Sequence, residues 1–193
     1  MPVFEFRASD HTYWLDGCLI PGTTQILKSA GVIDDTFYND AARIRGQAAH
    51  AACHYFAEGD LDMERLDPAL VPYVTAYGKF LTDTGFIPKE CEKPIYHPTY
   101  LYGSTPDHIG DLKKADAIAE LKTGTMMPWT SLQTAFQAMA RWPNDYMTKI
   151  RIGVELSAKG TYRFQFFEDL NDFDVAAGML ASFNWKKNHL KGA

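Results

Sequence analysis

The order of the predicted elements indicates an α/β fold in which a mixed β-sheet is flanked by α-helices. Apolar segments with the two-residue alternation of strands lie between longer segments with helical periodicity, and two central strand segments are separated by only a short polar turn. The chain has 193 residues, which is enough for one domain with a sizeable core. We expect a single domain, 1–193, with a hairpin and helices over about 1–85 and the sheet-bearing core over about 86–193.

The first part of the chain should form a hairpin followed by helices. Strands are expected at Phe4–Phe6 and His11–Leu15, because Asp16-Gly17 directly after the second segment is a strong turn signal. Helices are expected over Gln25–Ala30, about Thr36–Ala57 and Pro68–Thr84. Gly31 and Gly85 stand where the first and third of these helices should end.

The second of these helices has a polar face that allows three interpretations. At about 100° per residue, its apolar face comprises Ala41, Ile44, Ala48, Ala52 and Tyr55. Its opposite face comprises Arg43, Gln47, His50 and His54. A solvated surface is the default interpretation. A zinc site on the two histidines lacks the glutamate of H-E-x-x-H and a third ligand. The third interpretation places His50 in a metal site built elsewhere in the chain.

The second half of the chain should supply the remaining elements. Strands are expected at Glu90–His97, Ile150–Leu156 and Tyr162–Phe167. Helices are expected at Trp129–Arg141 and Asn171–Leu190, the latter capped by Asn171 or Asp172. The buried face of the first helix should comprise Leu132, Ala135, Phe136 and Met139, and its polar face Gln133, Gln137 and Arg141.

The central segments, Gly103–Asp111 and Ala117–Gly124, are the most informative part of the sequence. Because side chains alternate along a strand, Glu120 and Lys122 leave the same face while Leu121 points into the core. A polar turn, Lys113–Asp116, suggests an antiparallel hairpin that brings Asp107 beside Glu120. Two carboxylates and a lysine suit an oxygen-preferring cation such as Mg²⁺ or Mn²⁺.

A surface pair without function is the alternative for Glu120 and Lys122. An isolated E-x-K occurs by chance in most proteins of this size. However, Ile118, Ala119 and Leu121 indicate a strand that is buried on both sides, and such strands rarely carry an unpartnered charge.

The composition constrains the partners and the compartment. The net charge of −5 gives no support to nucleic-acid binding, although metal-binding acids account for part of it. Basic residues available for a groove are Arg43, Arg45, Lys113, Lys114, Arg141, Lys149, Arg151, Lys186 and Lys187. Three separated cysteines indicate neither a disulfide framework nor an iron–sulfur or zinc spacing. No apolar run suits a signal peptide or a membrane span, so we expect a cytoplasmic protein.

Four motifs occur in the order found in the PD-(D/E)xK nuclease superfamily, and the sequence resembles that superfamily from about His11 to Lys186. The motifs are Arg45-Gly46 with His50, Gly103 with Pro106-Asp107, Glu120–Gly124, and Leu132-Gln133. The first of them resembles that of the RecB-like branch, which includes phage exonucleases. The opening His-x-Tyr hairpin and Asn184-Trp185-Lys186 are similar to small phage-encoded members.

The resemblance implies a restriction-endonuclease-like core and specific roles for residues. Asp107, Glu120, the Leu121 carbonyl and His50 would bind one or two Mg²⁺ or Mn²⁺ ions, and Lys122 would orient or activate the attacking water. Gln133 matches the glutamine of the Q-x-x-x-Y motif, which contacts DNA or the lysine. Gln137 stands where the tyrosine is common, and Glu120 replaces the branch's more frequent aspartate. The four-cysteine cluster of some members is absent, so no iron–sulfur cluster is implied.

Other residues are candidates for supporting roles. Glu92, and less plausibly Glu90, would add a metal ligand from the preceding strand, although a surface acid is the alternative. Arg43 and Gln47 lie on the helical stripe of His50, where they would meet a phosphate or a DNA end.

The expected function is sequence-non-specific exonucleolytic hydrolysis of DNA from its ends, in phage-type recombination, repair or DNA degradation. A phage-encoded enzyme would act in the host cytoplasm, together with a single-strand annealing or recombination protein. Three alternatives are an endonuclease of the same superfamily, a nuclease-like module that binds DNA or protein without cutting, and a zinc hydrolase using His50 and His54. Full retention of Asp107, Glu120 and Lys122 argues against the binding module.

Overall fold

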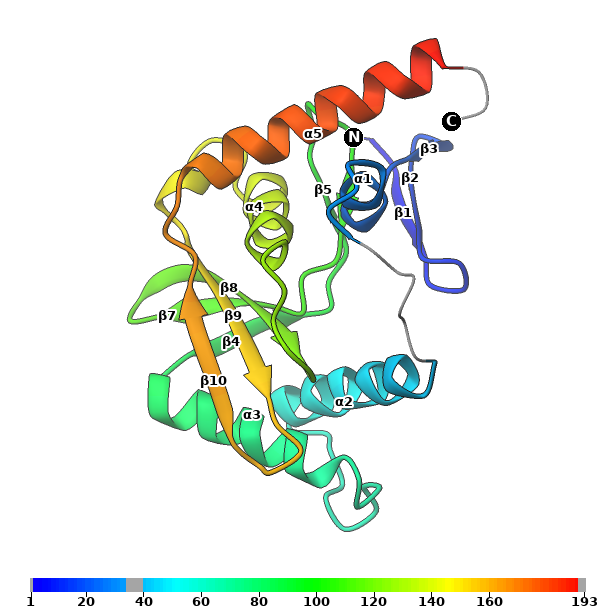
Figure 1. Ribbon diagram of the computed structural model, residues 1–193. Coiled ribbons are helices and arrows are strands. Elements are labelled where there is room, and N and C mark those ends of the chain that lie inside the picture. Colours follow the sequence, from blue (N-terminus) through cyan, green and yellow to red (C-terminus); the bar gives the residue numbers. More distant parts are fainter. Residues whose placement is uncertain (1, 34–39, 191–193) are drawn as a thin grey trace.

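The structure is a computed structural model that describes residues 2–33 and 40–190. A mixed five-stranded sheet with helices on both faces forms its centre, which confirms the expected fold class (Figure 1). The strands are β4 (Ile87–Cys91), β7 (His108–Leu112), β8 (Ala115–Lys122), β9 (Ile150–Leu156) and β10 (Tyr162–Phe166). Their spatial order is β10-β9-β8-β7-β4, and the β8–β9 pair is parallel while the other pairs are antiparallel.

The middle strand, β8, is buried on both faces, as its apolar run predicts. Ala117, Ala119 and Leu121 pack with the helices α2 (Asp40–Glu58) and α3 (Val71–Thr84). Ile118 leaves the opposite face and packs with α1 (Thr23–Ser29), α4 (Thr130–Arg141) and α5 (Asn171–His189). Because side chains alternate along a strand, Glu120 shares the face of Ile118 and points toward α4. Figure 1 shows α4 and α5 on one side of the sheet and α2 and α3 on the other.

Two smaller sheets lie beside this core. The strands β1 (Phe4–Arg7), β2 (Thr12–Leu15) and β3 (Cys18–Ile20) form an antiparallel meander, and β5 (Ile95–Tyr96) pairs with β6 (Gly103–Ser104). Tyr13 of β2 packs its ring directly on Gly103, and its hydroxyl lies 2.8 Å from Thr105 Oγ1. The N-terminal meander is therefore anchored on the segment that leads into β7.

The burial predicted for α2 is wrong by about one position. Ala49, Ala52 and Cys53 are buried, whereas Ile44 and Tyr55 are 59% and 52% exposed. Small alanine side chains define an apolar face only weakly, so contacts with α3 and the sheet decide the rotation of the helix. The expected start of this helix at Thr36 lies outside the described residues.

Three local expectations are also corrected. The strand expected over 90–97 is divided into β4 and β5, because Glu92 adopts a left-handed backbone conformation with φ of 46°. The turn between β7 and β8 consists only of Lys113 and Lys114, since Leu112 already pairs with Ala115. At the start of α5, Leu170 occupies the N-cap position and makes no side-chain cap, so neither predicted cap residue caps the helix.

The contact between Tyr13 and Gly103 leads to a test of how the meander is held. A Cβ at position 103 would overlap the base of the Tyr13 side chain, which cannot swing away without moving β2. Gly103→Ala should therefore lower the free energy of unfolding by about 1–3 kcal/mol, the usual cost of overpacking.

Gly178→Ala is the matched control for this change. Gly178 is exposed in α5, and a Cβ there meets nothing within 4 Å. Alanine should raise the unfolding free energy by up to about 1 kcal/mol, because it is the better helix former. Urea unfolding of both variants measures the difference, and equal effects would contradict the proposed packing.

Candidate active site

The predicted hairpin is confirmed, and it determines the relative position of Asp107 and Glu120. β7 pairs with β8 so that His108 faces Ala119, which places Asp107 opposite Glu120 at the entrance to the hairpin. Asp107 Oδ2 accepts a hydrogen bond of 2.7 Å from the Leu121 backbone amide. The Asp107 carbonyl accepts the Glu92 amide at 2.9 Å, which ties the end of β4 to the same point.

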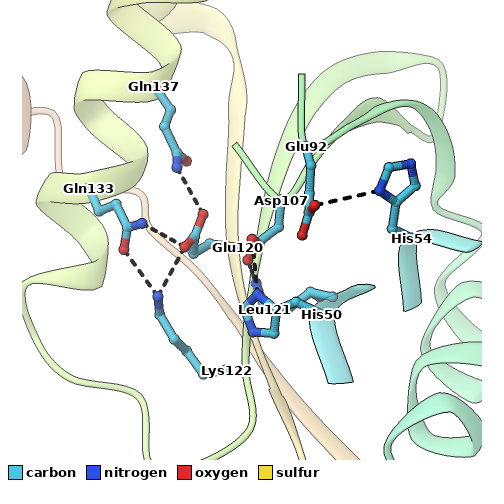
Figure 2. A network of polar contacts seen from close by, with 9 residues as sticks. All are labelled: His50, His54, Glu92, Asp107, Glu120, Leu121, Lys122, Gln133 and Gln137. Atoms are coloured by element: carbon cyan, nitrogen blue, oxygen red, sulfur yellow. Dashed lines mark hydrogen bonds and ion pairs between the residues drawn. The ribbon is translucent and has the colours of Figure 1, made fainter. Parts of the chain in front are cut away.

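Glu120 is buried, with 3% of its surface exposed, and hydrogen bonds surround its carboxylate. Oε1 accepts from Lys122 Nζ at 3.0 Å and from Gln133 Nε2 at 2.6 Å. Oε2 accepts from Gln137 Nε2 at 2.8 Å. Lys122 Nζ also lies 3.1 Å from Gln133 Oε1, which completes a triangle of side chains (Figure 2).

Gln137 corrects the polar face predicted for its helix. Its side chain is fully buried, whereas the sequence pattern placed it on the outer polar stripe of α4. One turn of helix separates Gln133 from Gln137, so both amides reach the same carboxylate from one side. This part of α4 is polar because it faces Glu120.

His50 reaches the site from α2, on the other layer of the fold. Its Nδ1 lies 3.1 Å from Asp107 Oδ1, so the two oxygens of Asp107 contact α2 and β8 respectively. Glu92 adds a third group, because one ligand atom from each of His50, Glu92 and Asp107 lies within 4.8 Å of the others. Figure 2 shows Asp107 between Glu120 with its hydrogen-bonding partners and Glu92 with His54.

The pKa values of the two carboxylates are shifted in opposite directions. Burial alone would raise the pKa of Asp107, but the charge and hydrogen bond of His50, helped by Lys122, lower it to about 2. Burial also works against protonated His50, yet Asp107 raises the pKa of that imidazole above its ordinary value. Burial and the neighbouring Asp107 raise the pKa of Glu120. The contact with His50 is the reason that the pKa of Asp107 is not raised like that of Glu120.

A divalent cation is chemically compatible with the group of His50, Glu92 and Asp107. Two carboxylates and one imidazole are ligands that Mn²⁺ accepts, and the oxygens suit Mg²⁺. Asp107 is tied at one oxygen by a backbone amide, which orients the other toward His50. Glu120 lies outside this group of three, and its carboxylate accepts hydrogen bonds from Lys122, Gln133 and Gln137. The Leu121 amide donates to Asp107.

The remaining candidates lie further from this group. His54 is 3.0 Å from Glu58 and 3.6 Å from Glu92, so the two histidines of α2 have different carboxylate partners. Gln47 and Arg43 are exposed one and two turns before His50, and they hydrogen bond to each other at 3.3 Å. Within the described part of the chain, the group of possible ligands contains one histidine, which does not favour the zinc interpretation.

A cleft of about 620 Å³ connects these residues with the N-terminal meander. His50, Asp107, Glu120 and Gln133 line it together with residues of the N-terminal part, among them His11, Tyr13 and Lys28. Sequence reasoning assigned no site role to that N-terminal part. The His-x-Tyr pattern was its only signal, and nothing local shows that β2 faces Asp107 from more than 90 residues away.

The sequence matches no protein-family model and no curated protein. The similar proteins are solved structures. The structure is similar to an alkaline exonuclease (LHK-Exo) from Laribacter hongkongensis, with 17% identity and a TM-score of 0.45, over 84% of this chain and 86% of that chain. LHK-Exo in complex with dAMP gives 16% identity and a TM-score of 0.40, over 90% and 95%. At these values the function is inferred from this chain's own residues.

The position of Glu92 leads to a test by metal binding. Glu92→Gln keeps the size of the side chain but removes a carboxylate from the group with His50 and Asp107. Mn²⁺ affinity measured by calorimetry should fall by tenfold or more, because even indirect partners of metal ligands contribute about that much. Glu58→Gln, which changes an exposed partner of His54, is the control and should bind normally. Unchanged affinity in Glu92→Gln would remove this residue from the site.

Proposed function

We propose that this protein is a metal-dependent deoxyribonuclease that hydrolyses phosphodiester bonds from DNA ends without reading sequence. The observation that carries the proposal is the meeting of two sets of groups at Asp107, which lines one cleft together with His50 and Glu120. His50 and Glu92 lie near one oxygen of Asp107, and Glu120 with its partner Lys122 follows on β8. A divalent cation supports phosphodiester hydrolysis by polarising the phosphate and activating water, and a positioned ammonium group can orient that water.

The chain's own residues have separate tasks in this proposal. His50, Asp107 and Glu92 would hold one cation, and Glu120 with the Leu121 carbonyl is proposed to contribute on the side of β8. A divalent cation there supplies positive charge to the scissile phosphate and makes water more acidic. Lys122 is held by Glu120 and Gln133, so its ammonium group stands in a fixed place to orient the attacking water.

The lack of base-specific recognition is proposed because the helices of the chain are engaged in packing on the sheet. Base readout needs side chains that enter the major groove from a docked helix or strand. Within the described residues, α1, α4 and α5 pack together over one face of the sheet, and α2 and α3 cover the other. Contacts to phosphates carry no sequence information, so ends are the simplest source of selectivity.

The proposed setting is recombination, repair or DNA degradation. An exonuclease of this kind would act beside a protein that anneals or exchanges single strands, and a phage-encoded one would work in the host cytoplasm. None of the helices in the described ranges is both long and apolar enough to span a bilayer.

The test of end dependence compares two substrates of the same sequence. Linear end-labelled DNA should be lost progressively with Mg²⁺ or Mn²⁺, and a chelator should stop the loss. Covalently closed circles should survive at equal enzyme and low salt. Discrete internal fragments, or circles cut as fast as linear DNA, would indicate an endonuclease. DNA binding without any metal-dependent cutting would indicate a binding module.

A second test concerns Lys122. Lys122→Ala should lower kcat about a hundredfold or more, because the group acts on the reacting water and phosphate and has little part in core packing. Mn²⁺ affinity should stay close to normal, since Lys122 is not proposed as a ligand. Lys113→Ala, an exposed lysine in the β7–β8 turn, is the control. A Lys122→Ala variant with near-normal kcat would show that the site is misplaced.

A further inference from the structure

The two edges of the five-stranded sheet differ in how they are protected against pairing with another chain. At one edge, β4 contains Pro88, and its register with β7 shifts between Pro88 and Glu90. Prolines and bulges are devices that keep an edge strand from pairing further. At the other edge, β10 contains no proline and pairs with β9 in an unbroken register. The second edge, drawn in orange in Figure 1, is therefore the one that can accept a further strand.

Hydrogen bonds at the two ends of β10 determine which of its backbone groups point away from β9. The Ser157 amide donates to the Thr161 carbonyl at 2.9 Å, and the Phe167 amide donates to the Arg151 carbonyl at 2.9 Å. Backbone groups alternate in direction along an antiparallel strand, so every second residue from Thr161 to Phe167 bonds to β9. The amides and carbonyls that point outward belong to the aromatic residues of the strand: Tyr162, Phe164 and Phe166.

The side chains of these residues form an aromatic ladder that is partly open to solvent. The ring centroids of Tyr162 and Phe164 are 6.2 Å apart, and those of Phe164 and Phe166 are 5.5 Å apart. Phe164 and Phe166 are 38% and 45% exposed. Phe166 also lines a hollow of about 160 Å³ with Met147 and Leu170, which are both exposed. Exposed apolar side chains beside outward-pointing backbone groups are typical of an interaction surface.

A second copy of β10 fits this edge in an antiparallel register centred on Phe164. A twofold axis at Phe164 places Tyr162 of each copy opposite Phe166 of the other, so the outward backbone groups meet as hydrogen-bonded pairs. Aromatic side chains directly opposite each other stabilise such pairs. Arg163 then lies opposite Gln165, and no like charges face each other. A register centred on Arg163 would set two guanidinium groups opposite each other, which is unfavourable.

We propose that two copies of this chain associate through β10, in an antiparallel pair centred on Phe164 that joins their two sheets into one. A second copy is the occupant that the strand favours, because β10 is complementary to itself both in hydrogen bonding and in charge. None of the residues assigned to the candidate active site belongs to β10. The proposed association is therefore independent of the nuclease function.

The first test uses the full chain at increasing protein concentration, without DNA or metal. Sedimentation velocity should show a monomer that converts to a dimer. Over the same concentrations, hydrogen exchange followed by NMR should slow at the Phe164 and Phe166 amides, which become bonded in the dimer. Exchange at the Phe167 amide, which already bonds to Arg151, should not change. A chain that stays monomeric at every concentration would overturn the proposal and leave this edge to a strand of another protein.

The second test examines the register by changing the charge at Gln165, an exposed residue of β10. The Arg163 side chain is 83% exposed, although it also bonds to Glu155 of β9. Gln165→Glu places a carboxylate opposite Arg163 of the second copy, so the Kd of the dimer should fall severalfold. Gln165→Lys places a like charge there, so the Kd should rise severalfold.

Asn188→Lys is the control for the change of charge. Asn188 is exposed at the far end of α5 from β10, and the variant should associate like the wild-type protein. The register is wrong if both Gln165 variants shift the Kd in the same direction, or if Asn188→Lys weakens association as much as Gln165→Lys. An oligomer that neither Gln165 variant affects would place the interface elsewhere and would also overturn the proposal.

Discussion

The carboxylate of Asp107 is the point on which the site depends, because its two oxygens join the two layers of the fold. One oxygen accepts the Leu121 amide from the middle of the sheet, and the other contacts His50 from α2. A buried carboxylate is costly without such partners. The low pKa of Asp107 and the raised pKa of His50 describe an ion pair. A cation bound there would take the place of the imidazole proton, since a ligating histidine is neutral.

Glu120 is the neighbour of Asp107, and its pKa is shifted in the opposite direction. Its burial and its acidic neighbour raise its pKa, while Lys122, Gln133 and Gln137 supply the hydrogen bonds that keep it in place. Two neighbouring carboxyl groups whose pKa values are pushed apart are typical of sites that move protons. The same hydrogen bonds explain why α4 carries amides on a face that is turned toward the sheet.

The N-terminal meander is held in place by Gly103, and its position affects access to the acidic residues. Gly103 lets Tyr13 pack against the segment before β7, and the Tyr13 hydroxyl contacts Thr105. This contact holds β2 beside the entrance to β7, so that residues of β2 and α1 line the same cleft as the acidic residues. Access to the acids is therefore limited by an element that contributes no proposed metal ligand.

Local patterns in the sequence determined the order of the elements and the faces of the central strands. The alternation of Glu120, Leu121 and Lys122 and the short turn before them were enough to predict the β7–β8 hairpin, because strand side chains alternate and a hairpin sets its own register. Only the tertiary structure decided that Gln137 faces inward and that Glu92 joins His50 across 42 residues of sequence. The physical reason is that periodicity defines which residues share a face of one element. How far each helix turns about its axis, and which distant element it meets, depends on packing against the other layer.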